Sequence, residues 1–322
     1  MRILHCAGFN EQKLGQAFYS TDRKISNGLI RNGHCVYDFS YRYYAKRHTP
    51  LLLKYRRSET AEKALLEITK NFEPDLLMLG KSENIGADVL KIIRDRFPEI
   101  KIGMWWVDPI YILGDIEEKL SLLDGFFLTT DPKELSRVFN NKGLVDKSRY
   151  LPNICDSTID SYKGFECNSY KHDVLFIGRN DANRNGFIED LKSIGKNLNV
   201  GLYGQKGNLL LGNKYLQTIS QSKISLNFSR YNDLSMYSSD RIVHLAANGS
   251  MVLSSRVPNI ETVFSENEVA YFDDKKSMLE KIDWYLHHEE ERLQLAKAGW
   301  QRAHEDYSEV KVTKFMIDTI FS

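Results

Sequence analysis

The sequence is poor in the features that mark several protein classes. Its four cysteines stand alone and form no CxxC pair, which argues against a zinc site and a disulfide scaffold. No apolar run approaches the roughly eighteen residues of a membrane span, and no apolar leader opens the chain. A net charge of +1 without zinc-finger or helix-turn-helix spacing favours no nucleic-acid partner. We expect a soluble cytoplasmic protein whose thiols are reduced, at Cys6, Cys35, Cys155 and Cys167.

What the sequence does contain is a regular alternation of short apolar strands with helical periods. At 322 residues and 42% hydrophobic content, the chain is long enough for two ordinary cores. The alternation predicts an α/β fold with parallel sheets. The expected strands are 2–6, 35–39, 75–79, 101–106, 125–129 and 150–151, followed by 174–177, 199–203, 223–228, 251–254 and 269–272.

The alternation of strands and helices is interrupted once, in the polar stretch 151–170, which contains Pro152 and Asn153. We therefore predict two Rossmann-like parallel-sheet domains facing a cleft that would hold the substrate. The first covers residues 1–155 and the second residues 156–308. A last amphipathic helix over 309–322 is expected to return onto the first domain.

Basic residues follow the first strand expected in the second domain. The apolar run 174–177 ends at Gly178 and is followed by Arg179 and Arg184. Carboxyl ends of parallel strands open onto ligand crevices, and guanidinium groups with helix amides bind diphosphates without a metal. This pattern predicts a diphosphate site, although solvated surface arginines are the alternative.

Other polar residues follow the next strands and would face the same crevice. Tyr203 and Gly204 end one strand, and Asn227 and Arg230 follow another. Turns and loop caps are the alternatives for these residues. The next stretch predicts a helix start in which Ser239 or Asp240 is the N-cap before Arg241, with amides available to phosphate or hydroxyl groups.

Ordered motifs carry a family resemblance. Over about residues 171–307 the chain resembles the carboxyl-terminal domain of the CgeB-like, spore-maturation-type glycosyltransferases, which have the GT-B fold. The first half is similar through Trp105 to Pro109 and Tyr150 to Asn153. The matching stretches in the second half are Asp173 to Gly178, Arg184, Tyr203-Gly204, Lys223 to Phe228, Asp240-Arg241, Ala246 to Gly249, Glu261 to Phe264 and Glu291 to Gly299.

The resemblance implies a nucleotide-sugar donor and favours retention at the anomeric carbon. In the family a glutamate three residues after the arginine holds the ribose, and His244 stands there in this chain. A hydrogen-bonded helix histidine without a ligand is the alternative. The family also approaches the donor through the stretch here occupied by Asn259, Ile260 and Glu261, where a carboxylate favoured by a helix dipole is the alternative.

The first domain offers two carboxylates as catalytic candidates. Asp108 follows a strand and stands beside Trp105 and Trp106, whose faces would cover a sugar. An Asx turn before proline, with the tryptophans in the core, is equally compatible. Asp22 follows the first strand, as does Gln12, while His5 within that strand is expected to be buried and hydrogen-bonded.

A basic and aromatic tract spans 41–57 and includes Arg42, Lys46 and Arg47. We interpret it as the acceptor side, in contact with a glycan, a lipid-linked phosphate or the membrane face, while a solvated loop or a nucleic-acid strand are alternatives. Neither Asp273-Asp274 nor His287-His288 has metal-ligand spacing, so no metal is expected. The sequence thus predicts a metal-independent glycosyltransferase, and a sugar-nucleotide epimerase or hydrolase and a non-catalytic nucleotide-sugar-binding protein remain alternatives.

Overall fold

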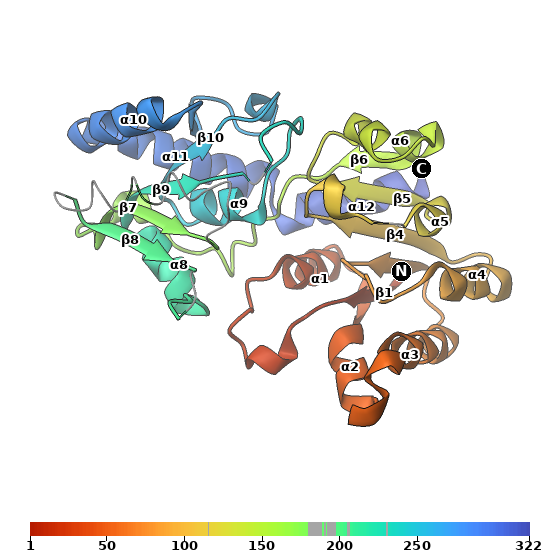
Figure 1. Ribbon diagram of the computed structural model, residues 1–322. Coiled ribbons are helices and arrows are strands. Elements are labelled where there is room, and N and C mark those ends of the chain that lie inside the picture. Colours follow the sequence, from red (N-terminus) through yellow and green to blue (C-terminus); the bar gives the residue numbers. More distant parts are fainter. Residues whose placement is uncertain (115, 180–188, 190, 192–197, 205–206, 230) are drawn as a thin grey trace. The chain divides into compact units, whose positions relative to one another are not determined.

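A computed structural model describes residues 1–114, 116–179, 189, 191, 198–204, 207–229 and 231–322 (Figure 1). Contacts divide the chain into two compact units. Unit 1 comprises Met1–Pro152 and Glu309–Ser322, and unit 2 comprises Asn153–Ser308. The division lies three residues before the boundary that the sequence indicates, and the terminal helix belongs to unit 1.

Unit 1 is built on a six-stranded sheet in the order β2-β1-β3-β4-β5-β6, and every paired strand is parallel. Buried apolar residues fill β3 and nearly all of β1 and β4, as both-face burial of a parallel sheet requires. The strands are β1 (Arg2–Ala7), β2 (Cys35–Ser40), β3 (Leu76–Leu79), β4 (Lys101–Trp106), β5 (Gly125–Leu128) and β6 (Ser148–Tyr150).

Helices connect these strands. The α-helices are α1 (Thr21–Arg31), α2 (Tyr41–His48), α3 (Arg57–Phe72), α4 (Ala87–Arg96), α5 (Glu117–Ser121), α6 (Lys142–Lys147) and α12 (Glu309–Phe321). Short 3-10 turns lie at η1 (Glu11–Lys13), η2 (Leu51–Arg56), η3 (Ile110–Ile112) and η4 (Pro132–Arg137). The tract 41–57 is therefore helical, and the loop alternative for it is wrong.

The terminal helix α12 packs closely on α1, β4 and β5. Glycines permit this approach, because a Cβ on Gly28 would lie 2.2 Å from the Glu309 carbonyl oxygen. On Gly103 a Cβ would lie 2.6 Å from Ile320. Arg31 pairs with the Glu309 carboxylate, so the amino-terminal end of α12 is bound to α1 by charge as well as by packing.

Gly28→Ala is expected to destabilise unit 1 by about 2 kcal/mol or more, because the added methyl group overlaps backbone that cannot move without displacing α12. Urea unfolding of the full chain measures the change. Gly8→Ala is the matched control, since the nearest atom to its Cβ is Arg42 Cδ at 3.9 Å. Equal stability of the two variants would contradict this close contact.

Unit 2 has a five-stranded parallel sheet in the order β11-β10-β9-β7-β8. Phe176, Leu226 and Leu253 are among its buried core residues. The strands are β7 (His172–Ile177), β8 (Val200–Tyr203), β9 (Ser222–Asn227), β10 (Met251–Ser255) and β11 (Ala270–Phe272). The helices are α8 (Asn213–Ser220), α9 (Asp240–Ala247), α10 (Lys275–His287) and α11 (Glu289–Asp306), with 3-10 turns η5 (Gly164–Glu166) and η6 (Ile260–Thr262).

The two sheets confirm the predicted fold class of two parallel-sheet α/β domains. Each predicted strand has an observed counterpart whose bounds differ by a few residues at most. Within the described part of the chain, no helix combines the length and the apolar character that crossing a bilayer requires.

Candidate functional site

Unit 2 has a topological switch point between β7 and β9. The chain leaves β7 for β8 on one side of it, whereas β9 pairs with β7 on the other side. Open parallel sheets bind ligands where such connections diverge, beyond the carboxyl ends of the strands. Gly178 follows β7 at this point and Asn227 ends β9.

The backbone at the switch point is tightly packed because two glycines meet there. Gly204 has a φ of 89°, and a Cβ on it would lie 2.7 Å from the Gly178 amide nitrogen. A Cβ on Gly178 would in turn lie 3.0 Å from a guanidinium nitrogen of Arg241. The absence of side chains at both positions lets Arg241 lie directly against the end of β7.

Arg241 places a positive charge at this edge. Its guanidinium lies 5.5 Å from the ring centre of Phe176, and one nitrogen donates long bonds of 3.4 Å to the Asn227 side chain and the Phe228 carbonyl. Its recorded partners are thus neutral oxygens and a ring, and no carboxylate pairs with it in the described parts of the chain. An uncompensated cation beside a helix N-terminus suits a phosphate.

Asn227, at the end of β9, helps to hold the Arg241 guanidinium in place. Its side chain is buried, and its amide donates to the Ser254 hydroxyl at 2.9 Å. Its carbonyl oxygen accepts from Ser239 at 3.3 Å and from Arg241. The expectation that Asn227 faces the crevice is therefore corrected, because this buried amide bridges β10 and α9.

Helix α9 begins at Asp240 with Ser239 at the N-cap position, as the sequence indicates. The Ser239 hydroxyl is directed to Asn227, so it makes no side-chain cap, and Asp240 is exposed in the first turn. Arg179 is exposed directly after Gly178. Arg184 and Arg230 lie outside the described residues.

Two other residues that were predicted to contact the donor direct their polar atoms away from this edge. The Tyr203 hydroxyl reaches back along the sheet to His172 Nε2 at 3.2 Å, across Gly201, which has no side chain to block it. The His244 ring is buried, with Nδ1 lying 3.4 Å from the Asp160 carboxylate and the ring in a T-shaped contact with Tyr215. The structure therefore agrees with the alternative that His244 is a helix histidine whose ring is satisfied within the protein.

The stretch 259–261 follows β10, and its polar side chains are bonded to other residues of unit 2. Asn259 adopts a φ of 60° and donates to the Ser235 hydroxyl at 3.0 Å, and Ile260 is buried. Glu261 pairs with Arg256, which also contacts Glu266 at 2.7 Å and Asp273 at 3.1 Å. Arg256 directly follows β10, but the sequence pattern was not used to predict it as a site residue. Three carboxylates balance its charge.

In unit 1 the carboxyl ends of the strands carry a chain of alternating charges. Asp108 follows β4 and pairs with Lys81, which follows β3. Lys81 also contacts Glu83 at 3.1 Å, and Glu83 pairs with Arg42 at 2.5 Å. Lys81 and Glu83 were missed, although the rule that selected Asp108, a polar residue just beyond a strand, applies to both.

Trp106 does not offer its face to a sugar. Trp105 and Trp106 are 4% and 3% exposed, so both belong to the core, and the Lys81 amine lies 5.1 Å from the Trp106 ring centre. The predicted acceptor contact of Trp106 is therefore wrong, since consecutive residues of a strand buried on both faces point into opposite core layers.

Asp22 lies in the first turn of α1 and faces His5. Its Oδ1 is 3.7 Å from His5 Nε2, and neither buried atom has a hydrogen-bond partner in the part of the chain described. On the other side of the ring, Nδ1 lies 2.8 Å from the Ser26 hydroxyl, which donates to Asp38 at 2.6 Å. Because that hydroxyl gives its proton to Asp38, it accepts from Nδ1, and Nε2 is the ring nitrogen that faces Asp22.

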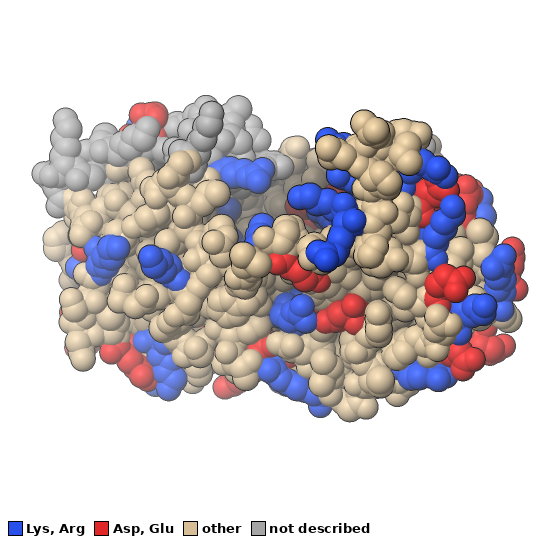
Figure 2. All heavy atoms as spheres, turned by 90° about the horizontal axis from the view of Figure 1, so that it is seen from below, with Lys and Arg blue, Asp and Glu red and all other residues tan. Residues whose placement is uncertain are grey.

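Lys46 and Arg47 are exposed on α2. Figure 2, which views the molecule from the side where α2 lies in Figure 1, shows basic and acidic side chains interspersed on this face. A continuous basic field of the kind that binds nucleic acid is not seen among the described residues of that face.

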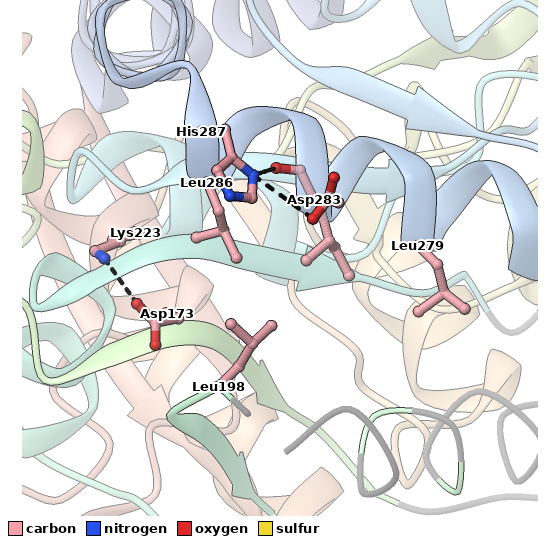
Figure 3. Close-up of a pocket in the computed structure, with 8 residues that line it drawn as sticks. Asp173, Leu198, Lys223, Leu279, Asp283, Leu286 and His287 are labelled. Atoms are coloured by element: carbon pink, nitrogen blue, oxygen red, sulfur yellow. Dashed lines mark hydrogen bonds and ion pairs between the residues drawn. The ribbon is translucent and has the colours of Figure 1, made fainter. Parts of the chain in front are cut away.

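A cavity of about 410 Å³ lies at the opposite, amino-terminal edge of the unit 2 sheet (Figure 3). Asp173 and Lys223, from the starts of β7 and β9, form an ion pair of 2.7 Å on one side, and leucines of α10 line the other. Its place at the amino ends of the strands separates it from the switch point. Among the described residues, no three His, Cys, Asp or Glu side chains come together as a possible metal site.

Comparison with solved structures identifies the architecture. Sucrose-phosphate synthase from Thermosynechococcus elongatus has a TM-score of 0.67 at 12% identity, covering 99% of this chain and 98% of that one. AviGT4, a glycosyltransferase of avilamycin A biosynthesis, has a TM-score of 0.64 at 11% identity, with 100% and 97% covered. Anabaena HepE in complex with UDP and glucose has a TM-score of 0.63 at 10% identity and full coverage of both chains.

The sequence comparisons are narrower. No curated protein matches the chain. Residues 183–318 match the model of a family described as glycosyl transferase-like, which leaves the CgeB-like branch unconfirmed. The chain thus has a GT-B fold, and its residues 183–318 are similar to a family described as glycosyl transferase-like.

Proposed function

We propose that the protein is a glycosyltransferase that moves a sugar from a nucleotide-sugar donor to an acceptor, without a metal ion. The observation that carries this proposal is Arg241, a guanidinium with no paired carboxylate in the described chain, set against Gly178 at the unit 2 switch point. A nucleoside diphosphate leaves with negative charge, which a preorganised cation stabilises as it develops. The complex of the similar HepE with UDP and glucose supports this class of donor.

The proposed roles follow from the positions of the side chains. Arg241 and the N-terminus of α9 hold the diphosphate, with Arg179 as a further phosphate ligand, and Asn227 fixes the Arg241 guanidinium. Arg184, outside the described residues, is added as a phosphate ligand from the sequence pattern alone. Asp108 is paired with Lys81 and orients or deprotonates the acceptor hydroxyl. Retention at the anomeric carbon is proposed from the family resemblance, with the leaving phosphate helping to remove the acceptor proton.

The decisive experiment incubates the full chain with UDP-, GDP-, CMP- and dTDP-sugars, with and without cell-envelope acceptors. Nucleoside diphosphate, free sugar and glycosylated product are quantified together. Transfer to an acceptor supports the proposal. Free sugar alone identifies a hydrolase, an isomerised donor identifies an epimerase, and binding without turnover identifies a non-catalytic nucleotide-sugar-binding protein.

Activity is expected to persist in excess EDTA, because the positive charge at the phosphates comes from guanidinium groups and a helix N-terminus. Initial rates with and without chelator check this after the protein has been dialysed against EDTA. Loss of turnover that Mg²⁺ or Mn²⁺ restores would show that a metal supplies this charge instead.

A further inference from the structure

A pocket of about 230 Å³ lies at the switch point of the unit 1 sheet. In the order β2-β1-β3 the chain leaves β1 for β2 on one side, while β3 pairs on the other. Gln12 follows β1, Arg42 follows β2 and Asn84 follows β3, so the carboxyl ends of all three strands supply residues to one hollow. This is where an open parallel sheet places its ligand. The lining residues are Gln12, Arg42, Tyr43, Ala45, Lys46, Arg57 and Asn84.

The lining of this unit 1 pocket is cationic. Three of its residues are basic and none is acidic. Glu83 balances Arg42, but neither Lys46 nor Arg57 has a hydrogen bond or ion pair to any described residue. Arg57 Nε is shielded from solvent without a partner. An oxyanion in the pocket would give the Lys46 amine and the Arg57 guanidinium the charge-assisted partner that they lack among the described residues.

The pocket is held in place by buried contacts. Burial raises the pKa of Tyr41 to about 12, so its hydroxyl keeps the proton that it donates to the Lys81 carbonyl at 2.9 Å. The Tyr41 hydroxyl oxygen in turn accepts a hydrogen bond from Arg42 Nε at 2.8 Å. The loop before Asn84 is fixed because the buried Lys119 amine donates to the Ser82 carbonyl at 2.6 Å. A preorganised cationic pocket binds an anion without first having to order its side chains.

We propose that the unit 1 pocket binds an oxyanion, a phosphate or a carboxylate group. On the basis of the glycosyl transfer proposed above, this anion is part of the acceptor. The charged chain from Arg42 through Glu83 and Lys81 connects the pocket to Asp108, so one acceptor would present its anion to the pocket and its hydroxyl to the carboxylate. The cavity volume is several times the roughly 30 Å³ of a water molecule, enough for such a group and its neighbouring atoms.

The test is calorimetric titration of the full chain with inorganic phosphate. Arg57→Gln is expected to raise the Kd for phosphate about tenfold or more, as loss of one charge-assisted hydrogen bond does. Lys46→Gln should weaken binding in the same direction and serves as the second variant if Arg57→Gln unfolds at a lower temperature. Arg241→Gln is measured in parallel, and phosphate binding to the pocket should survive in it because Arg241 belongs to unit 2.

Lys70→Gln is the matched control, since it removes one positive charge from the exposed end of the same helix, α3. Its Kd for phosphate should equal that of the parent protein. Equal weakening by Arg57→Gln and Lys70→Gln would mean general charge attraction and would overturn the proposal. Absence of saturable phosphate binding, or its loss only in Arg241→Gln, would do the same.

Parallel titrations with glucose 6-phosphate, glucuronate and glucose show whether the pocket prefers a phosphate or a carboxylate group. Tighter binding of the phosphate ester or of the carboxylate than of glucose identifies the group, and no preference over glucose contradicts an anion site. Nucleoside-diphosphate binding is followed in the same variants and should not change in Arg57→Gln. Transfer to neutral acceptors without phosphate binding would sink this inference alone, whereas phosphate binding in the pocket without any transfer would sink the acceptor role and leave the anion site.

Discussion

Arg241→Gln is expected to lower kcat/KM for sugar transfer by about 10²–10³-fold, the loss typical when one preorganised donor to a developing anion is removed. The guanidinium is held by Asn227, the Phe228 carbonyl and the Phe176 ring, so its orientation is set before the donor binds. Glutamine keeps much of the length and removes the charge. Steady-state rates at varied donor concentration, with nucleoside-diphosphate affinity from calorimetry, separate the effects on binding and on turnover.

Lys171→Gln is the matched control in unit 2, because it removes an exposed positive charge just before β7, at the opposite edge of the sheet. It should retain parental kinetics and affinity. Arg241→Lys should recover part of the rate, since an ammonium supplies charge without the planar fork. If Arg241→Gln turns over donor as fast as Lys171→Gln, the diphosphate does not lie at this switch point.

Asp108→Asn is expected to reduce transfer by about 10²–10⁴-fold while leaving donor binding unchanged, the range for loss of a general base. The ion pair with Lys81 fixes the direction of this carboxylate, and the amide can neither accept a proton nor balance the amine. Single-turnover transfer with donor prebound reports the chemical step separately from donor affinity.

Asp95→Asn, at an exposed site on α4, is the matched control and should leave the rate of transfer unchanged. Asp22→Asn is the informative comparison, because Asp22 is the other carboxylate predicted to be catalytic and lies 3.7 Å from the Nε2 of a buried histidine. A large loss in Asp22→Asn together with near-parental transfer in Asp108→Asn would move the base to α1 and refute the role given to Asp108.

The sequence determined the strands and the positions that follow them. Buried parallel strands need continuous apolar runs, as in β3 and β7, and such runs are visible in one dimension. For the same reason, the rule that polar residues beyond a strand face the ligand edge located Gly178 and Asp108. Applied fully, it would also have included Lys81 and Glu83.

Only the tertiary structure decided which of these side chains face the edge. Tyr203 lies at a position that this rule selects, and His244 at one that the family resemblance implies. Their polar atoms nevertheless contact His172 and Asp160 inside unit 2. The contact of Arg241 with Gly178 and the shared hollow of Gln12, Arg42 and Asn84 join residues far apart in sequence. Periodicity reports burial of a face, but the direction of a side chain depends on neighbours that the strand order brings beside it, and strand order is a property of the folded sheet.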